Sequence, residues 1–242
     1  MKKSELSQLL SENAYPGRGI AIGLTPNGRK LVVVYFIMGR SENSRNRIFV
    51  AEEAHLRTKA FDDTKLTDPS LIIYYPVRQF DRTLIVTNGD QTDTINDFIQ
   101  TGKSFEDALQ TREFEPDPPN YTPRISGIAQ FENGTVSYKL SILKTLNNHP
   151  MTNLRFFYQY DIPEPGTGHF IHTYQSDGTP LPSFEGEPRG ISIPDSIDAF
   201  TTDIWDALNK ENKVSLFVRF VDIQDATEET KIMNVHALRE GN

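Results

Sequence analysis

The 242-residue chain contains no cysteine, and this absence removes several kinds of chemistry at once. Disulfide bonds, thiolate metal centres and a cysteine nucleophile are all excluded. The sequence also has no Gly-x-Ser-x-Gly elbow, no P-loop and no Gly-x-Gly-x-x-Gly fingerprint, which removes several common enzyme classes. The lack of cysteine is compatible with a reducing compartment.

Long apolar runs and an excess of basic residues are also missing. No stretch approaches the roughly 18 apolar residues of a membrane span, and residues 1–10 lack an apolar signal region, so we expect a cytoplasmic protein without a membrane partner. The 33 acidic residues outnumber the 25 basic ones and give a net charge of -8, which opposes binding to nucleic acid. With 37% hydrophobic residues, one domain over residues 1–242 is favoured over two.

Segments with strand character dominate the chain, and helical patterns lie between them. Apolar spacing predicts helices over residues 4–13, 95–99, 105–110 and 195–209. Hairpins are predicted for residues 19–24 with 30–38 and for residues 71–75 with 83–87. Further strands are predicted over residues 48–50, 124–131, 135–143, 154–160, 169–174 and 214–221. Hairpins without regular β-α-β alternation favour an α+β fold of stacked antiparallel sheets with helices outside.

One short polar loop, residues 39–47, concentrates three arginines between an apolar run and a strand-like segment. A strand that ends in such a loop gives Arg40, Arg45 and Arg47 a fixed base, from which planar guanidinium groups can hold phosphate. The alternative is a solvated basic hairpin loop. The acidic balance of the rest of the chain favours anion binding.

Three further polar segments are candidates for a site, and each has an ordinary structural alternative. Residues 88–93 precede a predicted helix, so they can bind an anion, or Asp93 can simply cap that helix. Glu115 and Asp117 lie on a backbone that prolines keep extended, so they either project together or form an exposed acidic connection. Arg124 adds a guanidinium group at the start of a predicted strand.

Two pairs of side chains depend on the alternation of a strand. His169 and His172 are three residues apart in a predicted strand and should face opposite sides, so we predict no metal site there. Tyr74 and Tyr75 are neighbours in a predicted strand, so one should face the core and the other the opposite side.

Taken in order, these loops resemble the archaeal-type IMP cyclohydrolase family. The family pattern is matched here by Arg40-Ser41, Asn46-Arg47, Tyr75, Asn88-Gly-Asp-Gln-Thr-Asp93 and Thr122-Pro-Arg-Ile125. The resemblance continues through residues 169–174 and 177–188 and spans roughly residues 16–190. Residues 1–15, as an N-terminal extension, and about 191–242, as a C-terminal extension, depart from the family pattern.

The resemblance implies both a fold and a reaction. The fold would be a four-layer αββα sandwich like that of the N-terminal nucleophile hydrolases, without their chemistry, because Met1 stands where those enzymes expose a nucleophile. The reaction would be the dehydrative closure of the formamido-imidazole-carboxamide ribonucleotide (FAICAR) to inosine monophosphate (IMP) in purine biosynthesis, with no metal or organic cofactor. We expect this nucleotide as the small-molecule partner, and a homo-oligomer. The alternatives are a nucleotide-binding regulatory protein without turnover and an amidohydrolase of similar fold.

Roles for individual residues follow as a hypothesis. Arg47 polarises a substrate oxygen, and Tyr75 donates a hydrogen bond or proton near the formyl group. Glu115, preferred to Asp117, assists proton removal or the departure of water. The substrate-binding candidates are Arg18, Arg40 and Arg124 for phosphate, Asn88 and Asp93 for base or ribose, and Asn46 beside Arg47.

Overall fold

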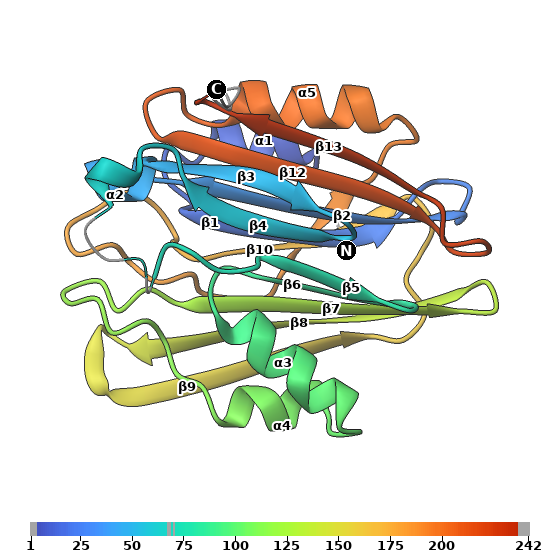
Figure 1. The fold of residues 1–242 in the computed structure, drawn as a ribbon, viewed down its shortest axis with the longest axis horizontal. Helices are drawn as coiled ribbons and strands as arrows, with labels where there is room; N and C mark the ends of the chain where they lie inside the picture. The colour runs from blue at the N-terminus through green and yellow to red at the C-terminus, as the bar shows by residue number, and fades with distance from the viewer. Residues whose placement is uncertain (1–3, 67–68, 70, 237–242) are drawn as a thin grey trace.

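The computed structural model describes residues 4–66, 69 and 71–236, and its strands form two antiparallel sheets (Figure 1). The first sheet has six strands. Their order is β11 (Arg189–Ser192), β10 (Thr167–His172), β1 (Arg18–Leu24), β2 (Lys30–Met38), β12 (Lys213–Asp222) and β13 (Glu228–Asn234). Strands β1 and β2 form the predicted hairpin, in which Ile20 lies opposite Tyr35.

The second sheet has seven strands. Their order is β3 (Arg47–Glu52), β4 (His55–Ala60), β5 (Val77–Phe80), β6 (Thr83–Thr87), β7 (Arg124–Glu132), β8 (Thr135–Leu146) and β9 (His149–Tyr160). Only Leu56 and Val77 pair β4 with β5, so β3 and β4 are weakly tied to the rest. They reach the first sheet instead, where the Asn234 side chain bonds the N–H and C=O of Phe49 at 2.8 and 3.1 Å.

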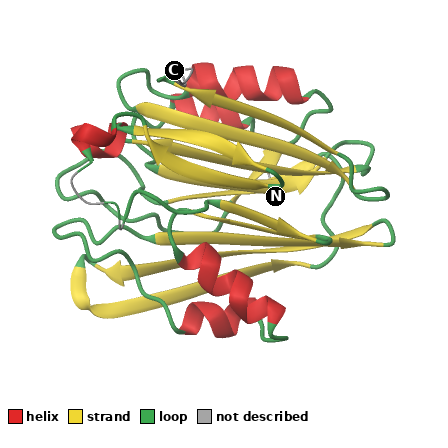
Figure 2. Ribbon diagram, in the orientation of Figure 1, coloured by secondary structure: helices red, strands yellow, loops and turns green. Residues whose placement is uncertain are grey.

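Helices lie on the outer sides of the two sheets (Figure 2). Helices α1 (Leu6–Ser11) and α5 (Ile197–Ala207) cover the six-stranded sheet, and α3 (Gln91–Gln100) and α4 (Phe105–Gln110) cover the seven-stranded one. The one-turn elements α2 (Glu42–Arg45) and η1 (Asp63–Lys65) lie in loops at one end. Within the described ranges, no helix is both long and apolar enough to cross a bilayer.

Buried apolar side chains form three groups, which the two sheets separate. The group between the sheets includes Ile22, Val33, Leu84 and Ile142. The group under α1 and α5 includes Leu10, Phe36 and Phe200, and the group under α3 and α4 includes Ile95 and Leu109. Strand β2 sends alternate residues into the first two groups, which explains why its sequence is apolar without interruption.

The α+β class with two antiparallel sheets is confirmed, and so are the four predicted helices, to within a few residues at their ends. The predicted strand over residues 71–75 is wrong. The N–H groups of Ile72 and Ile73 both bond the Pro69 carbonyl, which makes a turn, and Pro76 offers no N–H to a ladder. The hairpin partner of β6 is therefore β5, which was not predicted, and neither were strands β4, β11 and β13.

Candidate active site

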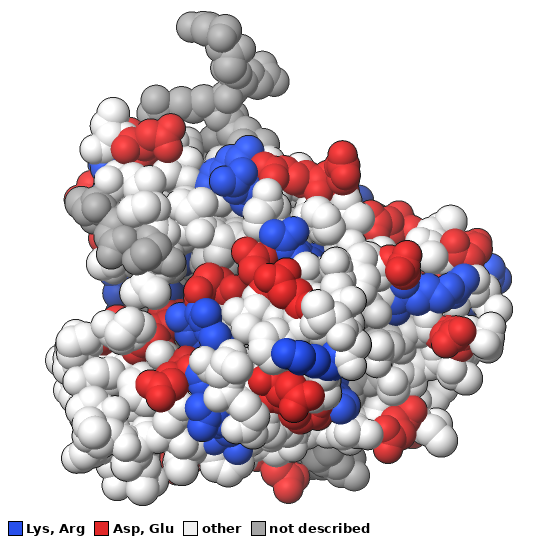
Figure 3. All heavy atoms as spheres, turned by 60° about the horizontal axis from the view of Figure 1, so that its bottom comes forward, with Lys and Arg blue, Asp and Glu red and all other residues white. Residues whose placement is uncertain are grey.

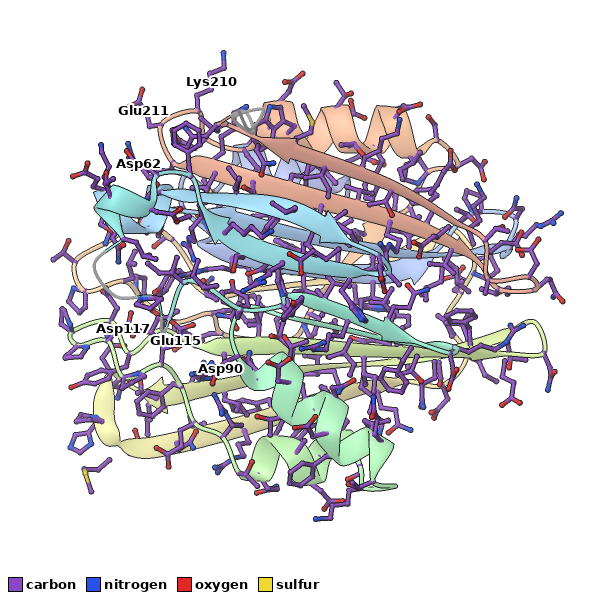
Figure 4. All side chains as sticks on the ribbon, viewed as in Figure 1. Asp62, Asp90, Glu115, Asp117, Lys210 and Glu211 are labelled. Carbon is purple, nitrogen blue, oxygen red and sulfur yellow. The ribbon has the colours of Figure 1, made fainter. Side chains whose placement is uncertain are left out.

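Six polar side chains converge at the end of the two sheets where β1 and β3 begin. We call this group the arginine–tyrosine cluster, and its members are Arg18, Tyr35, Arg47, Tyr74, Glu115 and Tyr174. They come from both sheets and from the loops between them. Figure 4 shows Glu115 and Asp117 at this end, at the level between the sheets. Segments that are distant in the sequence therefore meet at one place.

Arg47 is a buried cation whose hydrogen-bonding capacity is largely unused. It is 1% exposed, and its Nε donates to the Ser44 carbonyl at 2.9 Å. Its two terminal nitrogens have no hydrogen-bond partner among the described residues. Burial, and then the neighbouring Arg18, lower the pKa of Arg47. A buried guanidinium with two unused donors is suited to hold a polarised oxygen, because such donors are costly to leave unpaired.

Tyr35 and Tyr74 form a buried phenol pair beside Arg47. Their hydroxyl oxygens lie 2.8 Å apart. Burial raises the pKa of both phenols, so both are protonated at neutral pH. Whichever hydroxyl donates to the other, the second keeps a proton that it can give to a third group.

Glu115 supplies a buried carboxyl group to the cluster. The residue is 2% exposed, and its backbone N–H donates to the Thr122 carbonyl at 2.9 Å. Burial raises the pKa of Glu115, although Arg18 and Arg124 oppose that effect. A carboxyl whose pKa moves towards neutrality can both accept and return a proton.

Asp117 is engaged in holding its own loop. Its two carboxylate oxygens accept from the N–H and the hydroxyl of Thr122 at 2.6 and 2.5 Å. The Thr122 hydroxyl also lies 2.5 Å from the hydroxyl of Tyr174, which stacks on Tyr15. These hydrogen bonds link Asp117, Thr122 and Tyr174 and fix the loop that carries Glu115. Asp117 and Tyr174 are therefore positioning groups.

Tyr75, the tyrosine that the sequence analysis selected, lies outside the cluster. Its hydroxyl donates to Glu52 at 2.9 Å, and its ring packs under Arg57 and Arg78. The two adjacent tyrosines project to opposite sides, as expected, but it is Tyr74 that faces inward. The placement of Tyr75 therefore needs correction, because the motif did not indicate which side of the backbone met the site.

Arg124 is held at the edge of the cluster by groups from the α3 turn. Its terminal nitrogen donates to Gln91 at 2.6 Å and pairs with Asp90 at 2.8 Å, while its Nε has no partner in the described structure. Asn88 supports this arrangement, because it bonds Gln91, the Pro123 carbonyl and the Ile125 N–H. A Cβ at Gly89 would lie 2.5 Å from Arg124, which explains the glycine there.

The other predicted substrate residues already have protein partners. Arg40 donates to Asp177 at 2.6 Å, and Asp93 accepts from Arg78 at 2.5 Å. Asn46 is buried and exchanges two hydrogen bonds with the backbone of Asp62, both at 2.8 Å. Arg18 belongs to the cluster, and its Nε has no partner within the described ranges. The structure thus gathers Arg18, Arg47, Glu115 and Arg124 and leaves Arg40, Asn46 and Asp93 in separate contacts.

The two histidines of β10 face opposite sides of the six-stranded sheet, as the strand alternation predicts. His169 bonds the Tyr138 hydroxyl at 2.6 Å and stacks on Tyr160, both from the other sheet. His172 packs against Phe184 on the opposite side. Burial lowers the pKa of each to about 4. Both are therefore neutral packing residues at neutral pH.

No sequence pattern assigned a role to Tyr35, Tyr74, Thr122 or Tyr174. The Tyr74–Tyr75 pair was the one available signal, since alternation requires one of them to face inward. Tyr35 lies in an uninterrupted apolar strand, where nothing in the pattern separates the face between the sheets from the helix-covered face. Thr122 and Tyr174 fell within matched motifs, but their contact joins positions 52 residues apart.

Comparison with known proteins gives two matches. The family model described as "IMP cyclohydrolase-like protein" matches residues 15–226. A curated protein named "IMP cyclohydrolase" from Methanopyrus kandleri is 34% identical over 122 residues. That alignment covers 49% of this chain and 60% of the relative, so the match extends over less than two thirds of either protein.

Proposed function

Because this chain belongs to the IMP cyclohydrolase-like protein family, we propose that it closes FAICAR to IMP with loss of water. The relative from Methanopyrus kandleri carries the name of that activity and supports the proposal. The observation that carries it is Arg47, whose two free donors lie beside the Tyr35–Tyr74 pair and the carboxyl of Glu115.

The first step is attack of the carboxamide nitrogen on the formyl carbon of the same molecule. A C–N bond forms, and the formyl oxygen takes up negative charge. We propose that Arg47 and the free phenolic proton of the tyrosine pair stabilise this oxygen, with Tyr74 in the role first given to Tyr75. Glu115, as carboxylate, takes the proton that the nitrogen loses and passes it to the oxygen, which becomes a hydroxyl.

The second step expels that hydroxyl as water. The neighbouring ring nitrogen, originally the formamido N–H, loses its proton, and the C=N bond of the purine forms as the C–O bond breaks. Glu115, again a carboxylate, takes this proton from the nitrogen and delivers it to the leaving oxygen. One carboxyl group can serve both steps because its raised pKa makes both forms accessible.

The energetic demands suit these groups. Holding the two arms of one substrate in reactive geometry can be worth about 7 to 11 kcal/mol. Each fixed donor aimed at the developing oxyanion can add about 3 to 4 kcal/mol. Asp117, Thr122 and Tyr174 serve this reaction indirectly, because they keep the Glu115 loop in place.

Several finer expectations belong to this proposal. We propose that the two sheets and their helices form the four-layer αββα sandwich of the N-terminal nucleophile hydrolases, in a single domain over residues 1–242. Because the family model matches residues 15–226, we now place the C-terminal extension beyond residue 226 and not from about 191, and keep the N-terminal one at 1–15. The cytoplasmic location, the homo-oligomer and the absence of a nucleic-acid partner also remain proposals. Basic and acidic side chains are interspersed on the face in Figure 3, and this mixture supports the last of them.

The direct test is incubation of the purified protein with FAICAR, followed by chromatographic detection of IMP. We expect IMP to accumulate faster than in a protein-free control. The Arg47→Lys variant should form it at least tenfold more slowly, because lysine lacks the planar fork. Binding of FAICAR without any IMP would identify a nucleotide-binding protein without turnover and reject the proposal.

A further inference from the structure

A second polar pocket lies beside the arginine–tyrosine cluster. It has a volume of about 480 Å³ and lies between the end of β8 and the segment over residues 175–185. Lys144, Thr145 and Ser183 contribute polar groups to its lining. The backbone of Ser183 pairs with that of Tyr174, whose hydroxyl reaches the Thr122 hydroxyl at the cluster. A backbone bridge between Ser183 and Tyr174 therefore joins the pocket to the cluster.

Lys144 is a buried cation that shares this pocket with the carboxyl group of Glu185. It is 9% exposed, and its Nζ donates to the Phe184 carbonyl at 2.6 Å. An ammonium group has three donors, so two are left for other partners. No carboxylate in the described ranges forms an ion pair with Lys144, whereas Lys139 on the same strand pairs with Glu106 at 2.7 Å. Burial lowers the pKa of Lys144 although Glu185 opposes that effect, so the buried charge is compensated only in part, and such a charge favours an anionic ligand.

Two hydroxyl groups in the same pocket are also unpaired. Thr145 is 2% exposed, and its Oγ1 has no hydrogen-bond partner among the described residues. The same holds for the Oγ of Ser183. Each hydroxyl can donate one hydrogen bond. One ammonium and two hydroxyl groups offer donors to the acceptor oxygens of a phosphate monoester, and the ammonium attracts its negative charge.

The three arginines first considered for phosphate are less suitable, because Arg18 belongs to the arginine–tyrosine cluster and the other two are already paired. Arg40 and Arg124 are already neutralised by Asp177 and Asp90 at 2.6 and 2.8 Å. We propose that Lys144, Thr145 and Ser183 bind the 5′-phosphate of the nucleotide, while its base and formamido arms reach the arginine–tyrosine cluster. This inference rests on the proposed function for the identity of the nucleotide.

The test compares binding of IMP and of inosine, which lacks the phosphate, by titration calorimetry. Wild-type protein should bind IMP far more tightly than inosine. Lys144→Met should weaken IMP binding more than tenfold and leave inosine binding unchanged, so the preference for the phosphate collapses. Lys139→Met is the matched control on the same strand and should bind both compounds as the wild type does.

Three results would overturn this subsite: wild-type protein that binds no IMP, unchanged IMP binding by Lys144→Met, or an equal loss of IMP and inosine. If Lys144→Met does not fold, Thr145→Val and Ser183→Ala replace it. Each should weaken IMP binding severalfold with inosine unchanged, and unchanged IMP binding in both would reject the subsite.

Because binding is read without turnover, a Lys144-dependent phosphate preference in a protein that forms no IMP from FAICAR would retain the subsite and reject the cyclohydrolase. FAICAR turnover by a protein whose IMP binding does not depend on Lys144 would retain the cyclohydrolase and reject the subsite.

Discussion

The hydroxyl oxygens of Tyr35 and Tyr74 lie 2.8 Å apart in the protein interior and join strand β2 to the segment that precedes β5. Only one proton can lie between the two oxygens, so the other remains available as a donor. Arg47 lies close enough to influence both phenols and has two unused donors of its own. This end of the sheets thus provides donors that are fixed before any substrate binds, as stabilisation of an oxyanion requires.

Tyr74→Phe should lower kcat by at least tenfold and raise KM less, because the lost hydroxyl acts in the transition state. Tyr75→Phe is the matched control, since Tyr75 bonds Glu52 outside the cluster. It should keep kcat and KM within about twofold of wild type. Steady-state formation of IMP from FAICAR measures both variants, and a large kcat loss in Tyr75→Phe with none in Tyr74→Phe would restore the original assignment.

Arg47→Lys should lower kcat/KM by more than tenfold, equivalent to about 1.4 kcal/mol of transition-state stabilisation. Lysine keeps the charge but not the two parallel donors. Arg45→Lys is a suitable control, because Arg45 is in the same loop and bonds Gly39 and Asn212. Equal rates for the Arg47 variant and the wild type would remove Arg47 from the mechanism.

Protonation of Glu115 should cause the loss of rate at low pH, which is the acid limb of the pH–rate profile. Its pKa is raised above the ordinary 4.5 by burial, and the ionised form is needed to take the carboxamide proton. The value of kcat/KM should therefore fall as the pH drops through a pKa above 4.5, and Glu115→Gln should lose most activity together with that limb. Asp117→Asn should reduce the rate but keep the limb. A limb that persists in the residual activity of Glu115→Gln would assign it to another group.

Local patterns predicted the elements well where a single face or turn determined them. The Asn27-Gly28 turn correctly located the β1–β2 hairpin, and the apolar face of α5 correctly located that helix. Strand β13 was missed because its residues are exposed or half-buried and alternate weakly between polar and apolar. A strand at the edge of a sheet is stabilised by pairing with one neighbouring strand, and a local sequence pattern does not contain that neighbour.

The site was harder to predict, because its geometry depends on contacts between distant segments. Arg47 and Glu115 could be selected, since a loop of arginines and a carboxyl at the start of a proline-rich segment are unusual in themselves. The choice between Tyr74 and Tyr75 depended on which side of one backbone segment faces β2. The role of Asp117 depended on the return of Thr122 to its carboxylate, which only the folded loop reveals.

The buried histidines of β10 should make the protein less stable in mild acid. Burial lowers the folded-state pKa of His169 and of His172 from 6.5 to about 4, so the unfolded chain binds more protons between these values. The stabilising effect of the neutral rings is complete above pH 6.5 and is lost as the pH falls towards 4, by up to about 3 kcal/mol for each histidine. Urea unfolding at several pH values between 7 and 4.5 measures this loss. His169→Gln and His172→Gln should each flatten the slope, because glutamine does not titrate, whereas His149→Gln at the exposed start of β9 should not. Identical slopes in wild type and both β10 variants would show that other groups carry the acid sensitivity.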